Sequence, residues 1–455
     1  MTAPRRARRG TSRKSRARVA ELVWRGKRVR RPAARGVRLR TDEIHGSGGD
    51  PNRLVHGDAS KVLRALAETL TGQVSLIYID PPFDTGQSFD FLTAVPGAAP
   101  GAPRLAIEAY RDDRGLDSWL GWFFGIAVQL RDLLAPGGSI YIHLDAHVAH
   151  YAKVVLDEVF GLESFQREIV WRIGWISGFK SRVRGWIRNH DTLLFYAKGG
   201  RPSVFHKEYV PYPEGYVRRD GAAPRGPGYP IDDVWNASRL DPLDSIQIVS
   251  FSREKVGYPT QKNEALVARI VRASSNPGDL VLDCFAGSGT TAVVAEKLGR
   301  RWVASDSSPV SIHVTRKRLL SRTGLKPFIV QSTRSRAQLE PAAKRRVLRV
   351  RAKVHARGRV TLEIASLHVP KLASSGPARA QVTHWAQWID AWCVDWDYRR
   401  GPMNASSHVT RKGSSATLEL AIEHTYAKPG TFVALVKVFD VLGGAATTTV
   451  QVTIE

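Results

Sequence analysis

The chain has 455 residues, of which 43% are hydrophobic, and a mean hydropathy of −0.24. These values are typical of a folded protein of two or three domains, and they exclude a wholly disordered or collagen-like chain. The formal net charge is +26 and the pI is about 10.4, so a polyanion such as nucleic acid is the first partner to consider. Residues 1–40 carry sixteen Lys and Arg against one acidic residue, and the rest of the chain is also basic.

Residues 1–50 are expected to be a disordered basic arm followed by a Gly-rich linker at Thr41–Pro51. An Arg-rich, acid-poor start also occurs in transit peptides, but this one lacks an apolar stretch and a clear amphipathic period. A nucleic-acid-binding arm is therefore favoured. No run of 18 apolar residues is present, so we expect no membrane span.

Cysteine and histidine usage predicts no metal and a reducing compartment. Cys284 and Cys393 are too few for a disulfide framework or a four-ligand zinc site. The thirteen histidines show no metal-ligand spacing. A cytoplasmic location is therefore expected.

From Leu54 onward, strand patterns alternate with helix patterns, which predicts a doubly wound, mostly parallel α/β sheet. Residues 199–257 interrupt the alternation because Gly, Pro, Tyr and Arg dominate there, which indicates an inserted surface segment that carries specificity. Two parts of one α/β domain are thus expected, at 51–198 and 258–330. Strands are expected at 74–80, 139–144, 168–173, 192–196, 280–283 and 302–306, and helices at 119–134, 147–160, 263–273 and 290–298.

Residues 345–455 are predicted to form a separate β-sandwich-like domain. Strand patterns occur at 359–367, 416–423, 431–439 and 447–454. The segment also holds Trp385, Trp388, Trp392 and Trp396, whose spacing would equally fit one face of a helix. A domain core is the favoured place for these tryptophans, rather than a platform for stacking bases.

The first motif with chemical meaning is the turn from Asp283 to Thr290, DCFAGSGT, between an expected strand and an expected helix. Glycines allow a ligand to approach the backbone, and the helix start offers free amides. Asp306 ends the next strand, where a carboxylate can accept hydrogen bonds from both ribose hydroxyls. There is no P-loop lysine, and the dinucleotide pattern is incomplete because Ala292 takes the place of its third glycine. An adenosine ligand without pyrophosphate, such as S-adenosylmethionine, fits better, and its cationic sulfonium tolerates Asp283 nearby.

The second motif is Asp80-Pro-Pro-Phe83, at the carboxyl end of an apolar strand, where open α/β sheets place their sites. The prolines restrict the backbone, so the Asp80 carboxylate and the Pro81 carbonyl can both accept protons from one planar amine. Phe83 offers a face for stacking. The exocyclic amine of a nucleobase matches these groups.

At these two motifs the chain resembles the DNA amino-methyltransferases, which combine a [D/N/S]-P-P-[Y/F] tetrapeptide with an F-x-G-x-G turn. The order of the motifs resembles the β group, including type III restriction-modification methylase subunits. The similarity covers about residues 50–325 and implies a Rossmann-like S-adenosylmethionine-dependent methyltransferase fold. Further similar strings begin at Asn52, Leu134, Asn189 and Tyr258.

The resemblance implies a role for each matching residue. The flipped target base would be held by Asp80, Pro81, Pro82 and Phe83. S-adenosylmethionine would be bound by Asp58, Thr260, Lys262, Asp283, Phe285, Gly287, Gly289, Thr290 and Asp306. Two positions depart from the family pattern: Asn263 and Cys284 stand where the family usually has proline.

DNA contacts are expected from the insert and from a preceding segment in which basic and aromatic residues alternate. The residues expected to contact DNA are Lys180, Arg182, Arg184 and Arg188. His143 and Asp145 are expected to position other groups, because methyl transfer to an amine needs no strong base before attack.

These observations predict a site-specific enzyme that methylates double-stranded DNA, with N(6) of adenine favoured because Asp occupies the first place of the tetrapeptide. N(4) of cytosine, an RNA substrate and a catalytically inactive DNA-binding protein are the alternatives. A restriction endonuclease subunit and a second copy of the chain are candidate partners.

Overall fold

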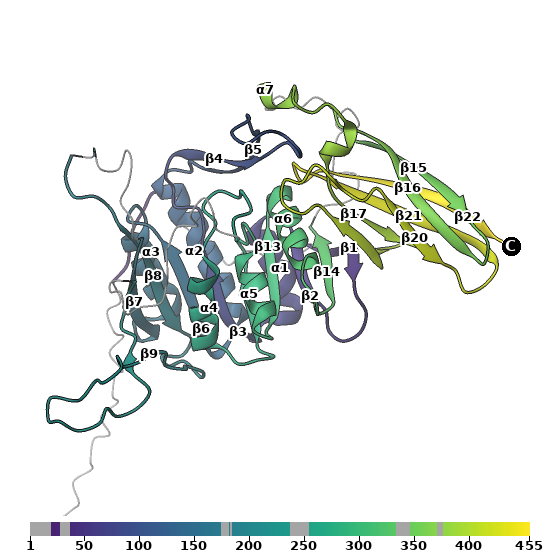
Figure 1. Cartoon of the computed structure of the whole chain (residues 1–455). Coiled ribbons are helices and arrows are strands. Elements are labelled where there is room, and N and C mark those ends of the chain that lie inside the picture. Colours follow the sequence, from purple (N-terminus) through teal and green to yellow (C-terminus); the bar gives the residue numbers. More distant parts are fainter. Residues whose placement is uncertain are drawn as a thin grey trace, which may run out of the picture.

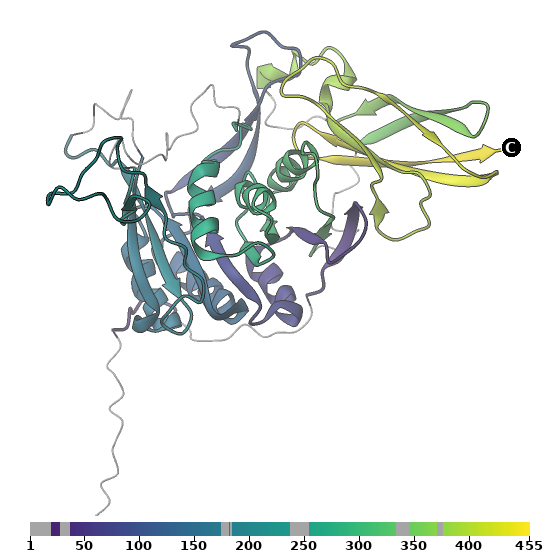
Figure 2. The same cartoon turned by 60° about the horizontal axis from the view of Figure 1, so that its bottom comes forward.

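The computed structural model describes residues 20–27, 37–173, 182, 184–236, 254–333, 346–370 and 376–455. An α/β unit with one large sheet occupies most of the molecule, and a second, all-β unit adjoins one edge of that sheet (Figures 1 and 2). In the described residues, no helix is long and apolar enough to cross a membrane.

The large sheet has eleven strands in the order β11-β7-β8-β6-β3-β12-β13-β2-β14-β1-β18. Most neighbours are parallel; β7–β8, β6–β8 and β1–β14 are antiparallel. The strands are β1 (Arg40–His45), β2 (Asn52–His56), β3 (Val74–Ile79), β6 (Leu134–Leu144), β7 (Phe165–Arg172), β8 (His190–Ala197), β11 (Val234–Trp235), β12 (Leu280–Asp283), β13 (Arg301–Asp306), β14 (Phe328–Ser332) and β18 (Met403–Asn404).

Helices cover both faces of this sheet, which confirms the expected doubly wound fold. One face packs against α1 (Ala59–Leu70), α2 (Leu116–Leu133) and α3 (Ala149–Phe160). The other packs against α4 (Glu264–Ser274), α5 (Thr290–Lys297) and α6 (Pro309–Leu320). The central strand β3 is apolar apart from Ser75, because its alternate residues face different cores: Ile77 faces the first, and Tyr78 the second.

A hairpin leaves the sheet after the Asp80–Phe83 segment. It consists of β4 (Gln87–Thr93) and β5 (Leu105–Asp112), which pair antiparallel. It runs across the upper side of the α/β unit in Figure 1 toward the all-β unit. The sequence analysis did not predict this hairpin.

The all-β unit consists of two sheets that share one core, and we call it the C-terminal sandwich. The first sheet is β15 (Val347–Val354), β16 (Arg359–His368) and β20 (Ala421–Thr425); the second is β19 (Ser407–Thr410), β17 (Ile389–Asp395), β21 (Gly430–Asp440) and β22 (Ala445–Ile454). Trp385 and Trp388 lie in a 3₁₀ turn, Trp392 lies on β17 and Trp396 follows it, so the alternative of a single tryptophan-lined helix is wrong. The last three are buried in or beside the shared core.

The prediction of a disordered arm fails at its described residues 20–27, because Trp24 is buried in the core of the α/β unit and the Leu22 N–H donates to the Glu158 carboxylate at 2.7 Å. The prediction of a linker at Thr41–Pro51 is wrong in its first half. Residues 40–45 form β1, which pairs with β14 on one side and with β18 of the C-terminal sandwich on the other. The sequence shows no alternation of apolar and polar residues here, because the two buried positions of the strand are the polar residues Glu43 and His45. Strand β6 also begins at Leu134, five residues earlier than the expected strand at 139–144.

Within 199–257, the described residues contain only the two-residue strands β9 (Tyr209–Val210), β10 (Tyr229–Pro230) and β11. This agrees with the absence of a stable period in the sequence. Strand β11 adds to the edge of the large sheet through β7.

Candidate active site

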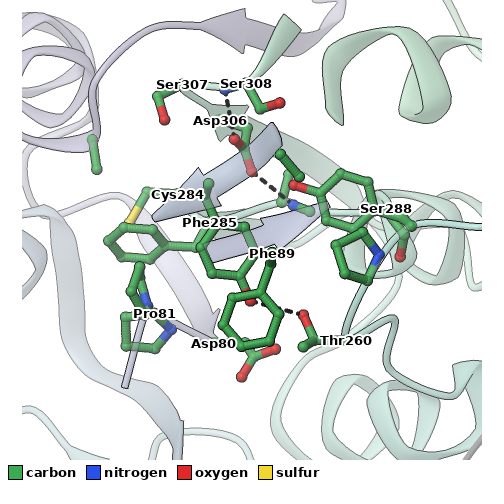
Figure 3. A pocket seen from close by; sticks show the side chains of 18 of the residues that line it. Asp80, Pro81, Phe89, Thr260, Cys284, Phe285, Ser288, Asp306, Ser307 and Ser308 are labelled. Carbon is green, nitrogen blue, oxygen red and sulfur yellow. Dashed lines mark hydrogen bonds between the residues drawn. The ribbon is translucent and has the colours of Figure 1, made fainter. Parts of the chain in front are cut away.

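A pocket of about 410 Å³ opens where β3, β12 and β13 end side by side in the sheet. The segment that follows each strand supplies part of its lining, from Asp80, from Asp283 to Thr291, and from Asp306 to Pro309. Figure 3 shows Asp80 and Asp306 on opposite sides of this space, with Phe285 between them. The size suits a small-molecule ligand, and the place is the one expected for an open α/β sheet.

The glycine turn after β12 depends on two aspartates for its shape. Asp283 accepts hydrogen bonds from the Phe285 backbone N–H at 2.9 Å and from the Thr291 hydroxyl at 2.6 Å. Asp306 accepts one from the Gly287 backbone N–H at 2.9 Å. Gly287 has φ +50°, and a β-carbon there would lie 3.3 Å from the Tyr258 ring, so a side chain would strain the turn.

The second glycine of the turn allows close helix packing. At Gly289, with φ +78°, a β-carbon would lie 2.4 Å from the Thr315 hydroxyl oxygen on α6. Gly289 also precedes the first residue of α5, Thr290, whose hydroxyl donates to the Lys262 carbonyl at 3.1 Å. At both positions, the positive φ and the close contact of a β-carbon explain why the residue is glycine. The turn that contains them lines the pocket.

The electrostatics of the pocket favour a cationic ligand. Burial raises the pKa of Asp283 to about 7 and also raises the pKa of Asp306. None of the ion pairs formed by the described residues involves either carboxylate, although both line the pocket. A ligand that brings a positive charge and a ribose would compensate both, so these residues fit S-adenosylmethionine.

Three further residues expected at the cofactor also line this pocket: Asp58, Thr260 and Lys262. Asp58 also caps α1, because its carboxylate accepts a hydrogen bond from the Lys61 backbone N–H. Thr260 has φ +54°, and its hydroxyl is 3.1 Å from the Tyr110 hydroxyl. The pocket therefore brings together every residue that the sequence analysis assigned to the cofactor, apart from Gly289, whose role is in the turn.

The Asp80–Phe83 segment forms the other part of the pocket lining. Oδ2 of Asp80 lies 2.6 Å from the Lys262 ammonium, and Oδ1 is buried without a hydrogen-bond partner among the described residues. The Pro82 carbonyl accepts a hydrogen bond from the Trp119 indole at 2.7 Å, which ties the segment to α2. Phe83 is half-buried, and its ring is 5.5 Å from the Lys262 ammonium.

Behind Phe83 lies a buried polar chain that the sequence analysis mentioned only in part. His143 lies 3.0 Å from the Tyr78 hydroxyl and 3.2 Å from the Asp191 carboxylate. Its ring is 6.5 Å from that of Phe83 and nearly parallel to it. The chain supports the expectation that His143 positions other groups, since Tyr78 and Asp191 occupy both of its nitrogens.

Asp112, Tyr110 and Tyr258 also line the pocket, and the sequence analysis missed all three. Tyr110 and Asp112 lie on β5, whose strand pattern, LAIEAYRD, was a signal that could have been found. Tyr258 belongs to the string that matched the family, and its ring faces Gly287.

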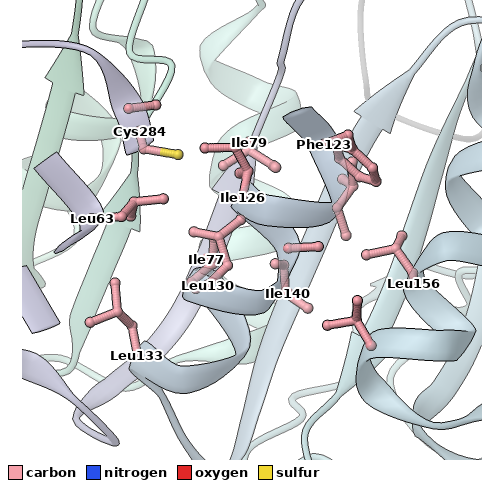
Figure 4. Close-up of a cluster of buried hydrophobic side chains, with 14 of the residues drawn as sticks. Leu63, Ile77, Ile79, Phe123, Ile126, Leu130, Leu133, Ile140, Leu156 and Cys284 are labelled. Atoms are coloured by element: carbon pink, nitrogen blue, oxygen red, sulfur yellow. The ribbon is translucent and has the colours of Figure 1, made fainter. Parts of the chain in front are cut away.

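The two departures from the family pattern have local explanations. Asn263 caps α4, because its side chain accepts a hydrogen bond from the Ala265 backbone N–H at 2.6 Å. Cys284 lies in the hydrophobic core with Leu63 and Ile79 (Figure 4), and burial raises the pKa of its thiol. Cys284 also lines the pocket.

Three of the four residues expected to contact DNA are described, and none of these three belongs to the pocket lining. Arg182 and Arg184 are exposed, and Trp186 beside them is fully exposed. Arg188 is engaged within the protein, because its guanidinium forms ion pairs with Asp191 and, at 3.6 Å, with Asp145. Lys180 lies outside the described residues.

Comparison with known proteins agrees with the geometry. The family model described as DNA methylase, for N6 and N4 methyltransferases, matches residues 74–317. DNA adenine methyltransferase YhdJ of Escherichia coli K12 is 29% identical over 290 residues, covering 60% of this chain and 84% of that protein. Type II methyltransferase M1.MboII of Moraxella bovis is 36% identical over 191 residues, covering 39% of this chain and 70% of that protein.

Among solved structures, the M1.HpyAVI complex with S-adenosylmethionine matches with a TM-score of 0.38 and 22% identity, covering 59% of this chain and 98% of that one. The family model spans more than half of this chain, and it includes both the Asp80–Phe83 segment and the glycine turn. The chain therefore belongs to the N6/N4 DNA methylases and is an S-adenosylmethionine-dependent DNA methyltransferase.

Proposed function

We propose that this enzyme methylates N(6) of adenine at specific sites in double-stranded DNA. The observation that carries the proposal is the Asp80 carboxylate, which lines the pocket with one buried oxygen that has no partner among the described residues, close to the ring of Phe83. A buried acceptor without a partner is costly, and an exocyclic amine supplies the missing donor. Among the relatives, YhdJ is named a DNA adenine methyltransferase, which favours adenine over cytosine.

The target amine is a poor nucleophile because its lone pair is delocalised into the ring. Asp80 and the Pro81 carbonyl would accept hydrogen bonds from its two N–H groups, so that the nitrogen can pyramidalise and its lone pair can point at the methyl group. Pro81 and Pro82 hold these acceptors in place, and the hydrogen bond from Trp119 to Pro82 adds to this rigidity. S-adenosylmethionine would supply the methyl group: its S–CH3 bond would break as the N–CH3 bond forms, the thioether S-adenosylhomocysteine would leave, and one amine proton would be released to solvent. No covalent bond to the protein is needed.

The reactive amine is not accessible in a duplex, so the base must leave the helix, at a cost of a few kcal/mol for unstacking. Stacking on Phe83 would offset part of this cost, since aromatic–base stacking contributes about 1–3 kcal/mol. The cofactor would be held by Phe285, Gly287, Thr290 and Asp306 on the glycine-turn side, with Asp58, Thr260 and Lys262 at its other parts. The remaining carboxylate, Asp283, would face the positive sulfonium.

The finer aspects of recognition are also proposals. Residues 199–257, with Arg182 and Arg184, would read the DNA sequence, and the basic arm would add phosphate contacts. Several relatives are named type II methyltransferases, so we propose that the enzyme is the modification partner of a restriction endonuclease. Homodimer formation is a further proposal, which sedimentation velocity would test. The DNA substrate would place the enzyme on the nucleoid.

The decisive experiment incubates the protein with mixed genomic DNA and labelled S-adenosylmethionine, digests the DNA and identifies the labelled nucleoside by mass spectrometry. Wild type is compared with Asp80→Ala, which removes the side-chain acceptor altogether. The expected result is N(6)-methyladenine that disappears in the variant. Label in N(4)-methylcytosine would keep the enzyme class and overturn the choice of base. Absence of label with intact cofactor binding would favour RNA as the substrate or an inactive DNA-binding protein.

A further inference from the structure

The β4–β5 hairpin connects the Asp80–Phe83 segment to the C-terminal sandwich. Its base follows this segment directly, and its tip, at the far end of the seven-residue β4 and the eight-residue β5, reaches the sandwich (Figures 1 and 2). Three consecutive zones of contact, at its base, middle and tip, give the hairpin a fixed position over the pocket.

At the base, Asp112 holds the backbone that follows Pro82. The Asp112 carboxylate accepts hydrogen bonds from the backbone N–H groups of Phe83 at 3.0 Å, Asp84 at 2.6 Å and Thr85 at 3.1 Å. It also accepts one from the Thr85 hydroxyl at 2.9 Å, and only 2% of Asp112 is exposed. Four donors around one buried carboxylate leave the segment little freedom.

This arrangement compensates for an unfavourable backbone conformation. Asp84 has φ +59°, in the left-handed region that non-glycine residues rarely adopt. The surrounding structure must therefore stabilise this conformation. The Asp112 carboxylate contributes to this directly, because it accepts a hydrogen bond from the Asp84 N–H. Since Phe83 directly precedes Asp84, the direction of the Phe83 ring depends on the same carboxylate.

In the middle, the hairpin is a wall of the pocket. Phe89 and Tyr110 stack on each other across the two strands, with ring centres 4.9 Å apart, and both line the pocket. One step further, Phe91 and Ala109 pack against Tyr258 and residues of α6. The wall thus contacts both the base side and the cofactor side of the site.

At the tip, the hairpin is embedded in the C-terminal sandwich. Val95 and Leu105 are each 1% exposed and belong to the same hydrophobic core as the sandwich strands. The Gln387 side chain donates to the Pro96 carbonyl at 2.8 Å, and the Gly97 N–H donates to the Ser414 carbonyl at 3.2 Å. The tip is therefore anchored by apolar burial and by two hydrogen bonds.

We propose that the C-terminal sandwich takes part in methyl transfer by holding the β4–β5 hairpin, and that Asp112 is a positioning residue for Phe83. None of the described residues of the sandwich lines the pocket. It acts through the hairpin tip, and Asp112 transmits the position of the hairpin to residues 83–85. The inference rests on the proposed function only where it assigns the target base to Phe83.

The first test compares Asp112→Asn with Asp90→Asn in the full-length protein. Both residues lie on the hairpin, but Asp90 is exposed and serves as the control. Backbone amide exchange of residues 83–85 is measured by mass spectrometry without cofactor or DNA. Asp112→Asn is expected to speed this exchange at least tenfold, to lower kcat on the order of 10²-fold, as a misplaced reacting group does, and to leave the Kd for S-adenosylmethionine unchanged. Unchanged exchange at residues 83–85 would overturn the role of Asp112.

The second test examines the tip with Leu105→Ala and, as control, Leu92→Ala, which removes the same group from a position on the hairpin that is 43% exposed. Leu105→Ala is expected to speed exchange along 87–112 and also at residues 83–85, with a several-fold loss of kcat. Val95→Ala is the milder variant should Leu105→Ala fail to fold, and tryptophan fluorescence checks the sandwich. Faster exchange confined to the tip, with kcat equal to that of Leu92→Ala, would contradict the coupling. The exchange results decide this even if wild type proves not to methylate DNA.

Discussion

The Lys262 ammonium lies 2.6 Å from Oδ2 of Asp80, and both side chains are largely buried, with 12% and 17% exposed. The same ammonium is 5.5 Å from the centre of the Phe83 ring. Lys262 therefore lies near both groups that the flipped base is proposed to contact. Oδ1 of Asp80 is left for the base amine, so a base that binds Asp80 competes with Lys262 for the same carboxylate.

This pairing predicts an energetic coupling between Asp80 and Lys262 that depends on ligands. In the free protein, a double-mutant cycle with Asp80→Asn and Lys262→Met should give a coupling of about 1 kcal/mol in the free energy of unfolding. With a cofactor analogue and target DNA bound, the coupling should fall, because the base then takes the carboxylate. Urea denaturation measures both values. Additive effects in the free protein would show that the ion pair is not formed in solution.

Phe83→Ala is expected to lower methyl transfer to duplex DNA by roughly 5- to 150-fold, which corresponds to the loss of about 1–3 kcal/mol of base stacking. The Kd for S-adenosylmethionine should change little, because the loss concerns the base. Phe83→Tyr keeps the ring and serves as the control, with near wild-type transfer. An unchanged rate for Phe83→Ala on duplex DNA would disprove the stacking role.

Cofactor affinity is expected to rise with pH up to about neutrality. Burial raises the pKa of Asp283 to about 7, so below this pH the free protein holds a proton that the sulfonium must expel. By linkage, this carboxyl favours the folded free protein at low pH, and that contribution is lost as pH rises from its ordinary pKa toward 7.

Isothermal titration of S-adenosylmethionine between pH 5.5 and 7.5 measures this dependence. Asp283→Asn should flatten it, and the slope that remains would come from Asp306, whose pKa burial also raises. A variant with the wild-type slope would show that Asp283 does not titrate with binding.

The elements that sequence patterns predicted are those whose causes are local. Each of the two motifs, Asp80-Pro-Pro-Phe83 and the glycine turn, directly follows an apolar run. The run alone predicts a buried strand, so the place of each motif at a strand end does not depend on distant parts of the chain. The roles of Glu43 and Asp112 were missed because the partners that explain their burial are distant in the sequence. Glu43 pairs with side chains more than 270 residues away, and no local period distinguishes a buried acid on a strand from an exposed one.

The contact between the sheet edge and the C-terminal sandwich is expected to depend on Glu43. This buried carboxylate on β1 forms ion pairs with Arg316 of α6 at 2.8 Å and with Lys437 of the sandwich at 2.6 Å. Glu43→Gln should lower the free energy of unfolding by about 3–5 kcal/mol, because it leaves two cations without their buried partner. Urea denaturation measures the loss, with Glu68→Gln on the exposed side of α1 as the control. Equal stabilities of the two variants would contradict this role.

The same carboxylate predicts acid sensitivity. Burial alone would raise the pKa of Glu43, but the charges of Arg316 and Lys437 and the hydrogen bond with His45 hold it well below its usual value. Its contribution to stability is therefore present above the ordinary pKa of glutamate and is lost as pH falls below it. The stability difference between wild type and Glu43→Gln should shrink in acid. A difference that stays constant from pH 7 down to pH 3 would refute this explanation.

DNA affinity is expected to depend on Arg182 and Arg184, which are both exposed. Each phosphate contact that is lost should reduce the magnitude of the slope of log K against log salt by about 0.9, so the double change to Ala should reduce it by up to about 1.8. The control is Arg349→Ala with Arg351→Ala, which removes the same charge from exposed positions of β15 in the C-terminal sandwich. Fluorescence anisotropy with duplex DNA at several salt concentrations measures both slopes. The salt slope reports counterions that direct phosphate contacts release from the DNA. Charges that do not touch the DNA act only through attraction that salt screens within a Debye length. Only the Arg182/Arg184 double variant is therefore expected to change the slope of log K against log salt. Equal slopes for the two double variants would place the DNA contacts elsewhere on the protein.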